Sequence, residues 1–233
     1  MTKQQSVAAV IPAAGIGQRM QAAIPKQYLQ LGDATVLEHS IRAMARDPRI
    51  GAVFVATAPD DAWFDKLSIT LSIPLLRVDG GATRAQSVAA GVAAAQRAGY
   101  RYVAVHDAAR PCLARSELAA VIEHGLEHSA GALLALPVAD TIKRASNSGY
   151  SVETVPREGL WQALTPQVFA ISVLIDAWRL VGVDDPYLTD EASAIEALGL
   201  QPRLVMGRRT NIKITQPGDE IIAAALLPEI VQE

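Results

Sequence analysis

The stretch IPAAGIGQRMQAAIPKQYL, Ile11–Leu29, combines a glycine-rich turn with two cationic side chains, Arg19 and Lys26. The turn follows the apolar run Val7–Ile11, and backbone N–H groups at such a turn point toward anions. A P-loop would end in Gly-Lys-Ser/Thr, and a dinucleotide fingerprint would need a third glycine where Met20 stands. A triphosphate carries roughly four negative charges, which a turn alone does not neutralise. The pattern therefore favours nucleotide phosphates held by the turn and both cations, although glycine turns after strands are also common without this role.

Asp107 is the second candidate, because it follows the apolar run Tyr102–His106 and should lie at the carboxyl end of a strand. A carboxylate there suits Mg²⁺, which binds oxygen donors and needs only one or two from the protein. Arg110 in the same loop would add an anion partner. Asp-Ala-Ala-Arg-Pro is also good turn material, so a capping role for Asp107 is an equal alternative. No second His or Cys lies at ligand spacing from His106, which we interpret as a buried strand residue.

Two further segments carry weaker signals. Asp79–Gly81 follows an apolar run, with Arg84 and Ser87 just beyond, and the paired glycines would let backbone groups read a base. Taken alone, this segment is better explained as an ordinary strand-to-helix turn. Near the end of the chain, residues 211–215 (NIKIT) alternate like a strand, and Lys213 there has the usual features of an exposed edge lysine.

Strand-like and helix-like segments alternate and must position these residues. The buried-strand runs are Val7–Ile11, Ala52–Thr57, Tyr102–His106 and Ala132–Leu136. The helix-like stretches between them are Thr35–Arg46, Ala85–Ala98 and Ser116–Glu127, with Ser116 as a candidate N-cap. A later helix, 192–198, would be capped by Thr189 or Asp190. This alternation predicts an α/β fold with a parallel sheet covered on both faces, and ligands bind beyond the carboxyl ends of such strands.

One segment departs from the pattern. Residues 139–157 have polar alternation on either side of Ser-Asn-Ser-Gly, which predicts a β-hairpin. An isolated hairpin is marginal in water, so we interpret the segment as an arm that packs on a second subunit; a surface insertion is the alternative. Trp161, just after the arm, is expected in the core.

Composition limits the function classes. A chain of 233 residues suits one domain, here 1–233, and its net charge of −3 disfavours a general nucleic-acid binder. The single Cys112 excludes a disulfide framework and a cysteine-rich metal site. We see no signal peptide and no apolar run of about 20 residues, so we expect a cytoplasmic protein without membrane segments.

Taken together, the motifs PAAGIGQRM–PKQY, DGGATRAQSV, VHDAARP, REGLWQALTPQVF, TDEASA and NIKIT resemble the 2-C-methyl-D-erythritol 4-phosphate cytidylyltransferase family. The resemblance runs from about Val7 to past Pro217 in the family's order. It implies transfer of CMP from CTP to methylerythritol 4-phosphate, with release of pyrophosphate, in the non-mevalonate route to isoprenoids. It also implies a Rossmann-like, mostly parallel sheet of the nucleotide-diphospho-sugar transferase type, and a homodimer formed through the β-arm.

The resemblance implies site roles as well. Arg19 and Lys26 would stabilise charge on the phosphates in the transition state, and Asp107 would hold Mg²⁺. Arg157 and Lys213 would position the acceptor phosphate, with Arg157 completing the partner's site in a dimer. The other acceptor-side positions are Asp107, Arg110, Thr141 and Thr189. The nucleotide would bind to Pro12, Ala13, Ala14, Gly15 and Gly17 through its phosphates and to Gly81, Ala82 and Ser87 through its cytosine.

Three positions depart from the family's pattern. Many relatives carry an acidic residue at Ala82, and some carry Asp at Thr210, where it could assist the metal. Asp107 is therefore our only predicted metal ligand. Pro156 could alter how the arm presents Arg157.

Three rival interpretations remain at this stage. A ribitol 5-phosphate cytidylyltransferase would share the fold and glycine turn, but usually differs around DAARP, GLW and TDEAS. A nicotinamide-dependent oxidoreductase lacks support because the third glycine is missing. A non-catalytic nucleotide-binding module would not be expected to keep Arg19, Lys26, Asp107, Arg157 and Lys213.

Overall fold

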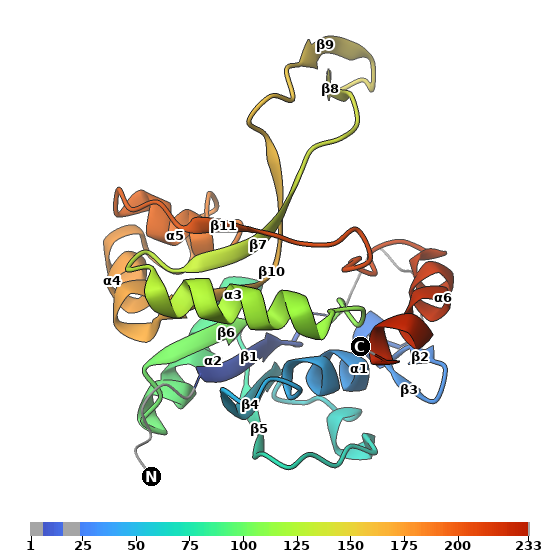
Figure 1. Cartoon of the computed structure of the whole chain (residues 1–233), viewed down its shortest axis with the longest axis vertical. Helices are drawn as coiled ribbons and strands as arrows, with labels where there is room; N and C mark the ends of the chain where they lie inside the picture. The colour runs from blue at the N-terminus through green and yellow to red at the C-terminus, as the bar shows by residue number, and fades with distance from the viewer. Residues whose placement is uncertain (1–6, 16–23, 233) are drawn as a thin grey trace.

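A seven-stranded mixed sheet forms the centre of the molecule (Figure 1). The computed structural model describes residues 7–15 and 24–232 of the 233-residue chain. The sheet order is β11-β7-β10-β6-β1-β4-β5, and only β10 runs antiparallel to its neighbours. The predicted mostly parallel α/β sheet is therefore confirmed. Its strands are β1 Val7–Pro12, β4 Ile50–Thr57, β5 Leu75–Asp79, β6 Tyr102–Val105, β7 Ala132–Pro137, β10 Trp161–Ala170 and β11 Arg203–Met206.

Helices cover both faces of this sheet. Side chains along β1 alternate between the faces, so Ala9 and Ile11 enter one core and Ala8 and Val10 enter the other. The first core is closed by α1 (Val36–Met44) and α3 (Arg115–Glu127). The second is closed by α2 (Arg84–Arg97), α4 (Ile171–Val181) and α5 (Glu191–Ala197). The strands and helices predicted from the alternation lie within a few residues of their expected places.

Helix starts explain the local boundaries. The Asp190 carboxylate accepts from the backbone N–H of Ser193 at 2.9 Å and caps α5, which confirms the predicted cap. The predicted cap of α3 is wrong, because the helix begins at Arg115 and Ser116 lies inside its first turn. There the Glu117 carboxylate reaches back to the backbone N–H of Ala114 at 3.1 Å. This bond satisfies a donor that an N-cap side chain does not reach.

A third, smaller core lies beside the sheet. Helix α6 (Asp219–Gln232) packs there, next to the short strands β2 (Gln30–Leu31) and β3 (Ala34–Thr35). Two single-turn helices, η2 (Lys26–Tyr28) and η3 (Phe64–Lys66), lie in the loops of the described chain. Within the described ranges, no helix has the length and apolarity needed to cross a bilayer.

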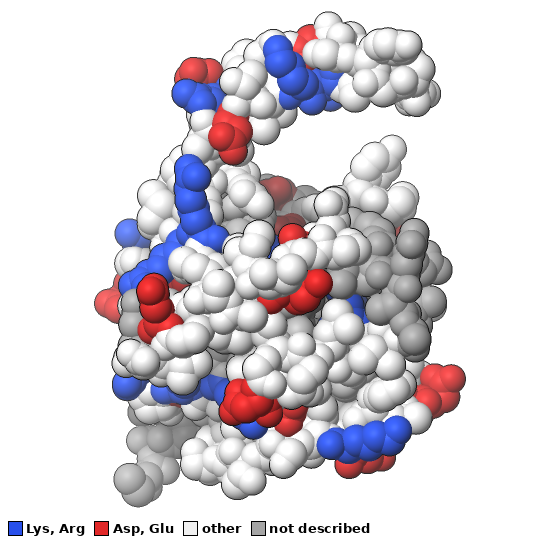
Figure 2. All heavy atoms as spheres, turned by 90° about the vertical axis from the view of Figure 1, so that its right-hand side faces the viewer, with Lys and Arg blue, Asp and Glu red and all other residues white. Residues whose placement is uncertain are grey.

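The predicted hairpin is present as an arm that stands away from the body (Figures 1 and 2). Strands β8 (Ile142–Ala145) and β9 (Ser151–Val155) pair antiparallel. In Figure 2 the arm bends over the body and leaves an open hollow beneath its tip. The prediction of a core tryptophan is wrong, because Trp161 begins β10 at the foot of the arm and is 38% exposed. The reason is its place where β10 leaves the covered part of the sheet.

Candidate active site

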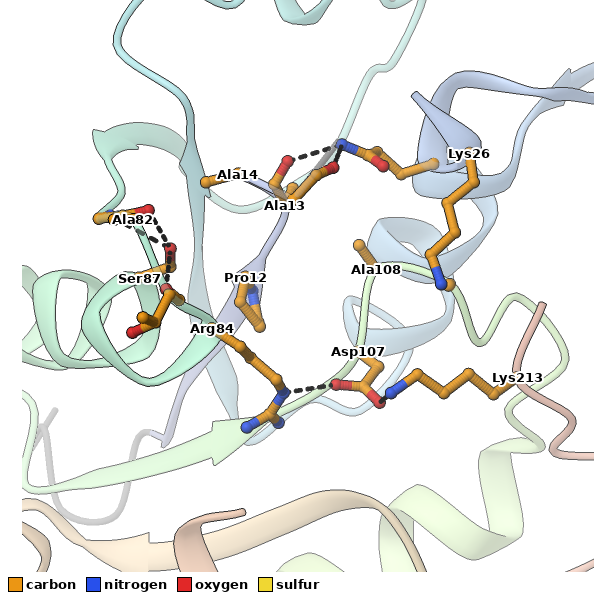
Figure 3. Close-up of a pocket in the computed structure, with 15 residues that line it drawn as sticks. Pro12, Ala13, Ala14, Lys26, Ala82, Arg84, Ser87, Asp107, Ala108 and Lys213 are labelled. Atoms are coloured by element: carbon orange, nitrogen blue, oxygen red, sulfur yellow. Dashed lines mark hydrogen bonds and ion pairs between the residues drawn. The ribbon is translucent and has the colours of Figure 1, made fainter. Parts of the chain in front are cut away.

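A pocket opens where the carboxyl ends of β1 and β6 meet the start of α2 (Figure 3). Its volume is about 180 Å³, and we call it the β1–β6 pocket. Every described residue that we assigned to the nucleotide lines it, together with Lys26, Asp107 and Lys213. Gly17 and Arg19 lie outside the described residues. The described residues that line it are Pro12, Ala13, Ala14, Gly15, Lys26, Gln27, Gly81, Ala82, Thr83, Arg84, Ser87, Asp107, Ala108, Ala109 and Lys213.

The described part of the glycine turn is held in place by the buried side-chain amide of Gln27. Gln27 Nε2 donates to the carbonyl of Ala13 at 2.7 Å and to that of Gly15 at 3.1 Å. The backbone N–H of Ala13 continues the sheet by donating to the Ala56 carbonyl at 2.7 Å. Because these carbonyls are occupied on the side of Gln27, the turn has a fixed orientation relative to β1. Gln27 is therefore a structural part of the pocket that the sequence patterns did not reveal.

Lys26 reaches the pocket from η2. Its ammonium donates to the carbonyl of Ile214 at 2.9 Å, which links the turn to the segment that carries Lys213. The η2 turn is itself anchored by Tyr28, whose hydroxyl donates to Asp61 at 2.8 Å and whose ring stacks on Trp63. Burial raises the pKa of Tyr28, and the adjacent Asp61 adds to this effect. Tyr28 is therefore a neutral donor that fixes the base of the Lys26 side chain.

The opposite wall of the pocket is a tight turn that leads into α2. A Cβ on Gly81 would lie 2.3 Å from the Cβ of Gln86, so only glycine fits at this position. The hydroxyl of Ser87 donates to the Thr83 carbonyl at 2.9 Å and receives the backbone N–H of Gly81 at 3.2 Å. The Gln86 side chain accepts from the backbone N–H of Ala82 at 2.8 Å. This wall presents backbone groups and one hydroxyl, which suits a small polar ring.

Asp107 lies at the centre of the charged floor of the pocket (Figure 3). Its Oδ1 accepts from Arg84 Nε at 3.0 Å, and its Oδ2 accepts from Lys213 Nζ at 2.7 Å. Arg110 Nε lies 3.6 Å from Oδ2. Burial alone would raise the pKa of Asp107, but the charges of Arg84 and Lys213 outweigh it and hold that pKa well below its usual range. The carboxylate is therefore ionised at neutral pH.

The backbone of Asp107 is fixed by a buried hydrogen-bond chain. His106 Nε2 lies 3.0 Å from the carbonyl of Arg110, which only accepts, so Nε2 carries the proton. His106 Nδ1 then accepts the Thr165 hydroxyl at 3.0 Å, and that hydroxyl oxygen accepts from the backbone N–H of Asp107 at 3.1 Å. Complete burial lowers the pKa of His106 to about 4. The prediction that His106 is a buried, hydrogen-bonded residue is confirmed.

Residues 211–215 do not form the predicted strand, and Lys213 is not an exposed edge lysine. This segment is irregular because its polar groups bond to the site. Asn211 Nδ2 donates to the Thr165 carbonyl at 2.9 Å, and the Asn211 carbonyl accepts from Arg110 at 2.7 Å. The backbone N–H of Ile214 donates to the Ala109 carbonyl at 2.8 Å. These bonds turn Lys213 toward Asp107 (Figure 3).

A larger cleft of about 600 Å³ adjoins the pocket and shares Lys213 with it. We call it the arm-base cleft, because residues 136–140 and Ile142 at the foot of the arm form one wall. Of the described residues that line it, four are cations, Arg110, Arg208, Arg209 and Lys213, and one is a carboxylate, Asp140; Arg110 and Lys213 also pair with Asp107. This charge suits an anionic group.

The remaining acceptor-side predictions are spread around the site. Arg157 lies at the foot of the arm, where it is exposed and bonds to the carbonyl of Ala139; it lines neither the pocket nor the cleft. Thr141 is exposed on the same arm. Thr189 lies across Arg84 from the pocket, in a small depression at the start of α5. One protomer therefore brings together Lys26, Asp107, Arg110 and Lys213, but not Arg157 or Thr141.

The residues present fit a metal ion that is held mainly by the phosphates of a bound nucleotide and only in part by the protein. Among the described residues, no group of three or more His, Cys, Asp or Glu side chains could hold a metal ion. Asp107 is an ionised carboxylate at the pocket floor, and each of its oxygens already bonds a cation. One carboxylate is enough for Mg²⁺ when phosphate oxygens and waters complete its shell. The donor set therefore fits Mg²⁺ bound with a nucleotide, and does not form a metal site by itself.

The chain is similar throughout its length to proteins of one family. A family model for 2-C-methyl-D-erythritol 4-phosphate cytidylyltransferase matches residues 7–229. The enzyme of that name from Escherichia coli O127:H6 is 44% identical over 233 residues, which cover 100% of this chain and 98% of the relative.

Solved structures agree with the sequence relatives. A crystal structure of a 4-diphosphocytidyl-2C-methyl-D-erythritol synthase superposes with a TM-score of 0.83 at 39% identity, covering 96% of this chain and 99% of the other. The 2-C-methyl-D-erythritol 4-phosphate cytidylyltransferase from Thermus thermophilus gives a TM-score of 0.78 at 34% identity, with 96% and 99% covered.

Proposed function

We infer the activity of this chain from its membership of the 2-C-methyl-D-erythritol 4-phosphate cytidylyltransferase family, to which it belongs by a match across residues 7–229. It transfers CMP from CTP to 2-C-methyl-D-erythritol 4-phosphate, giving 4-diphosphocytidyl-2-C-methyl-D-erythritol and pyrophosphate. The observation that carries the assignment is the 44% identity over the full chain. The β1–β6 pocket supports it, because its lining unites the predicted nucleotide residues with Lys26, Asp107 and Lys213.

CTP is proposed to occupy the β1–β6 pocket. The cytosine ring would lie against the wall made by Gly81, Ala82 and Ser87, where the turn at Gly81 leaves no space for a side chain. The phosphates would lie along the turn of Ala13–Gly15, which Gln27 holds in place. Lys26 lines the same pocket and would neutralise the phosphates, with Arg19 as its predicted companion.

The acceptor is proposed to enter from the arm-base cleft, with its phosphate next to Lys213, which faces both spaces. An oxygen of that phosphate forms a bond to the α-phosphorus of CTP, while the bond from this phosphorus to the bridging oxygen of pyrophosphate breaks. The attacking oxygen is already ionised near neutral pH, so no general base is required. The protein contributes position and charge neutralisation, to which Lys26 and Lys213 supply two cations.

Mg²⁺ is proposed as the cofactor, with Asp107 as its protein ligand. When bound, the ion would supply positive charge for the departing pyrophosphate. Asp107 suits this role because its carboxylate is ionised and bonded to Arg84, while its backbone N–H donates to the Thr165 hydroxyl. Thr210, where some relatives carry Asp, supplies no second carboxylate for the metal.

A homodimer formed through the arm, residues 139–157, is proposed as well. Tyr150 and Val152 near the arm's tip are 75% and 65% exposed, and a partner subunit packed on the arm would cover them. Arg157 and Thr141 would then act in the partner's site, which explains why neither lines the pocket or cleft of its own protomer. A cytoplasmic location remains a prediction.

Pyrophosphate release tests the assignment. The protein, CTP and Mg²⁺ are mixed with methylerythritol 4-phosphate or with ribitol 5-phosphate in parallel. We expect release only with the former. Release only with ribitol 5-phosphate would keep the nucleotide chemistry and replace the acceptor, and absence of release with both would contradict the assignment.

A further inference from the structure

Glu191 is a buried carboxylate that none of the roles above uses. The residue is 2% exposed, and it accepts two hydrogen bonds from the guanidinium of Arg84. Arg84 Nη1 lies 2.7 Å from Oε1, and Nη2 lies 3.1 Å from Oε2. This two-point geometry fixes the plane of the guanidinium as well as its position.

The start of α5 holds Glu191 rigidly. Gln167 on β10 is 1% exposed, and its amide accepts from the backbone N–H of Ala192 at 2.9 Å and donates to Asp190 at 2.8 Å. The central sheet therefore fixes the residues on both sides of Glu191. A carboxylate with so little freedom acts as a fixed anchor for Arg84.

Arg84, held in this way by Glu191, in turn fixes the position of the Asp107 carboxylate. Its third nitrogen, Nε, donates to Asp107 Oδ1 at 3.0 Å, so its guanidinium is shared between two carboxylates. Burial alone would lower the pKa of Arg84, but the charges of Glu191 and Asp107 outweigh it and raise that pKa. Arg84 is therefore a permanent cation held on three sides.

Lys213, the cation on the other oxygen of Asp107, is held very differently. It is a flexible point charge on an irregular segment, its side chain is 37% exposed, and it meets Oδ2 at 2.7 Å. Arg84 binds Asp107 from the first residue of α2 and is anchored at its far end by Glu191, whereas Lys213 lies on an irregular segment; the two side chains are similarly exposed, at 31% and 37%. Of the two, Lys213 is the one that substrates can draw away.

We propose that Glu191 is a positioning residue that fixes Arg84 on Asp107 Oδ1, so that Oδ2 can exchange Lys213 for a nucleotide-bound divalent cation while the carboxylate keeps its orientation. This inference rests on the proposed metal role of Asp107. Of the two cations bonded to Asp107, Arg84 is then the fixed partner and Lys213 the exchangeable one. Without Glu191, Arg84 is free to rotate toward Oδ2 and to compete there with the metal.

The test measures metal affinity without turnover. Mn²⁺ binding is followed by electron paramagnetic resonance in the presence of α,β-methylene-CTP, which does not release pyrophosphate. The variants are Glu191→Gln and Arg84→Lys; the second keeps the charge but loses the two-point geometry. Glu38→Gln is the matched control, because Glu38 is also buried and hydrogen-bonded at a helix start, to the backbone N–H groups of Thr35 and Ser68, but lines neither the β1–β6 pocket nor the arm-base cleft.

We expect Mn²⁺ affinity to fall about tenfold in both variants and to stay unchanged in the control, since partners of metal-ligating carboxylates typically contribute on this scale. Thermal melts show whether each variant is folded. Unchanged Mn²⁺ affinity in folded Arg84→Lys would overturn the proposal and leave Glu191 as a link between α2 and α5. An equal fall in Glu38→Gln would also overturn it. If the wild-type protein bound no Mn²⁺ with the analogue, the metal role of Asp107 would be wrong too, whereas the pyrophosphate assay would still stand.

Discussion

Lys213 Nζ lies 2.7 Å from Asp107 Oδ2, so the predicted acceptor-binding lysine is paired with the predicted metal ligand. Both side chains line the β1–β6 pocket. Lys213 helps to neutralise the buried Asp107 carboxylate, which would be costly to bury without a cationic partner. Any ligand that binds Asp107 or draws on Lys213 must therefore compete with this bond, which couples the two halves of the site.

Removing the lysine charge should mainly affect the acceptor. We expect Lys213→Ala to lower kcat/KM for methylerythritol 4-phosphate about 100-fold, the usual effect of losing one preorganised charge partner. CTP affinity measured without divalent metal should stay nearly unchanged, because the base wall and the turn are intact. Steady-state kinetics and equilibrium CTP binding measure the two effects, with Lys66→Ala as an exposed control. Equal losses for both substrates would show that the role of Lys213 is misassigned.

Replacing the carboxylate should affect the metal. Asp107→Asn keeps the shape but removes the charge that holds Arg84 and Lys213. We expect the Mg²⁺ concentration that gives half-maximal turnover to rise at least about tenfold, as for other changes to metal-binding groups. A Mg²⁺ titration of turnover measures this, and Asp176→Asn on the surface of α4 is the control. An unchanged titration would place the metal elsewhere.

Much of this site was predictable because parallel strands bring their carboxyl ends to one edge. Asp107 follows β6 and Ala13 follows β1, and these strands are neighbours in the sheet. The two loops therefore meet whatever their distance in sequence. Glycines at 80 and 81 also act locally, through backbone space, and their position after β5 was visible in the sequence.

The rest depended on contacts that no local pattern contains. Alternation in NIKIT predicted a strand, yet Asn211 bonds to Thr165 on β10 and turns Lys213 into the pocket. Glu191 and Arg84 are 107 positions apart, and nothing near either residue indicates the other. The role of Gln27 was equally hidden in the sequence, because its hydrogen-bond partners are the backbone carbonyls of the glycine turn. Tertiary hydrogen bonds decided all three.

A mixing experiment tests whether subunits share their sites. Arg157→Ala and Lys213→Ala should each be nearly inactive alone. When the two are unfolded together and refolded, a shared site gives each mixed dimer one intact site, and total activity should reach about a quarter of wild type if subunits pair at random. Absence of recovery, with mixed dimers present, would mean that Arg157 acts in its own protomer.

The arm itself should be required for dimers. Deletion of Ile142–Thr154 removes both strands of the hairpin along with exposed Tyr150 and Val152. We expect monomers by sedimentation and markedly lower activity. A fully active monomer would contradict the shared-site proposal.

Burial of neutral His106 should make stability depend on pH. Its pKa is about 4 in the folded protein and about 6.5 when unfolded, so between these values the unfolded chain binds the extra proton. The free energy of unfolding should therefore fall as pH drops through this window, by about 3 kcal/mol from His106 alone. Urea unfolding of the wild type and His106→Gln at several pH values measures it. The variant should lose this component, and equal pH dependence of both proteins would contradict the assignment of the neutral ring.

The central claim is that an oxygen of the acceptor phosphate attacks the α-phosphorus of CTP. The direct test uses methylerythritol 4-phosphate with ¹⁸O in its phosphate, and ³¹P NMR and mass spectrometry of the products. We predict that the diphosphate product keeps every label, including one in its bridge, and that the released pyrophosphate carries none. Labelled pyrophosphate, or release of inorganic phosphate in its place, would contradict the account.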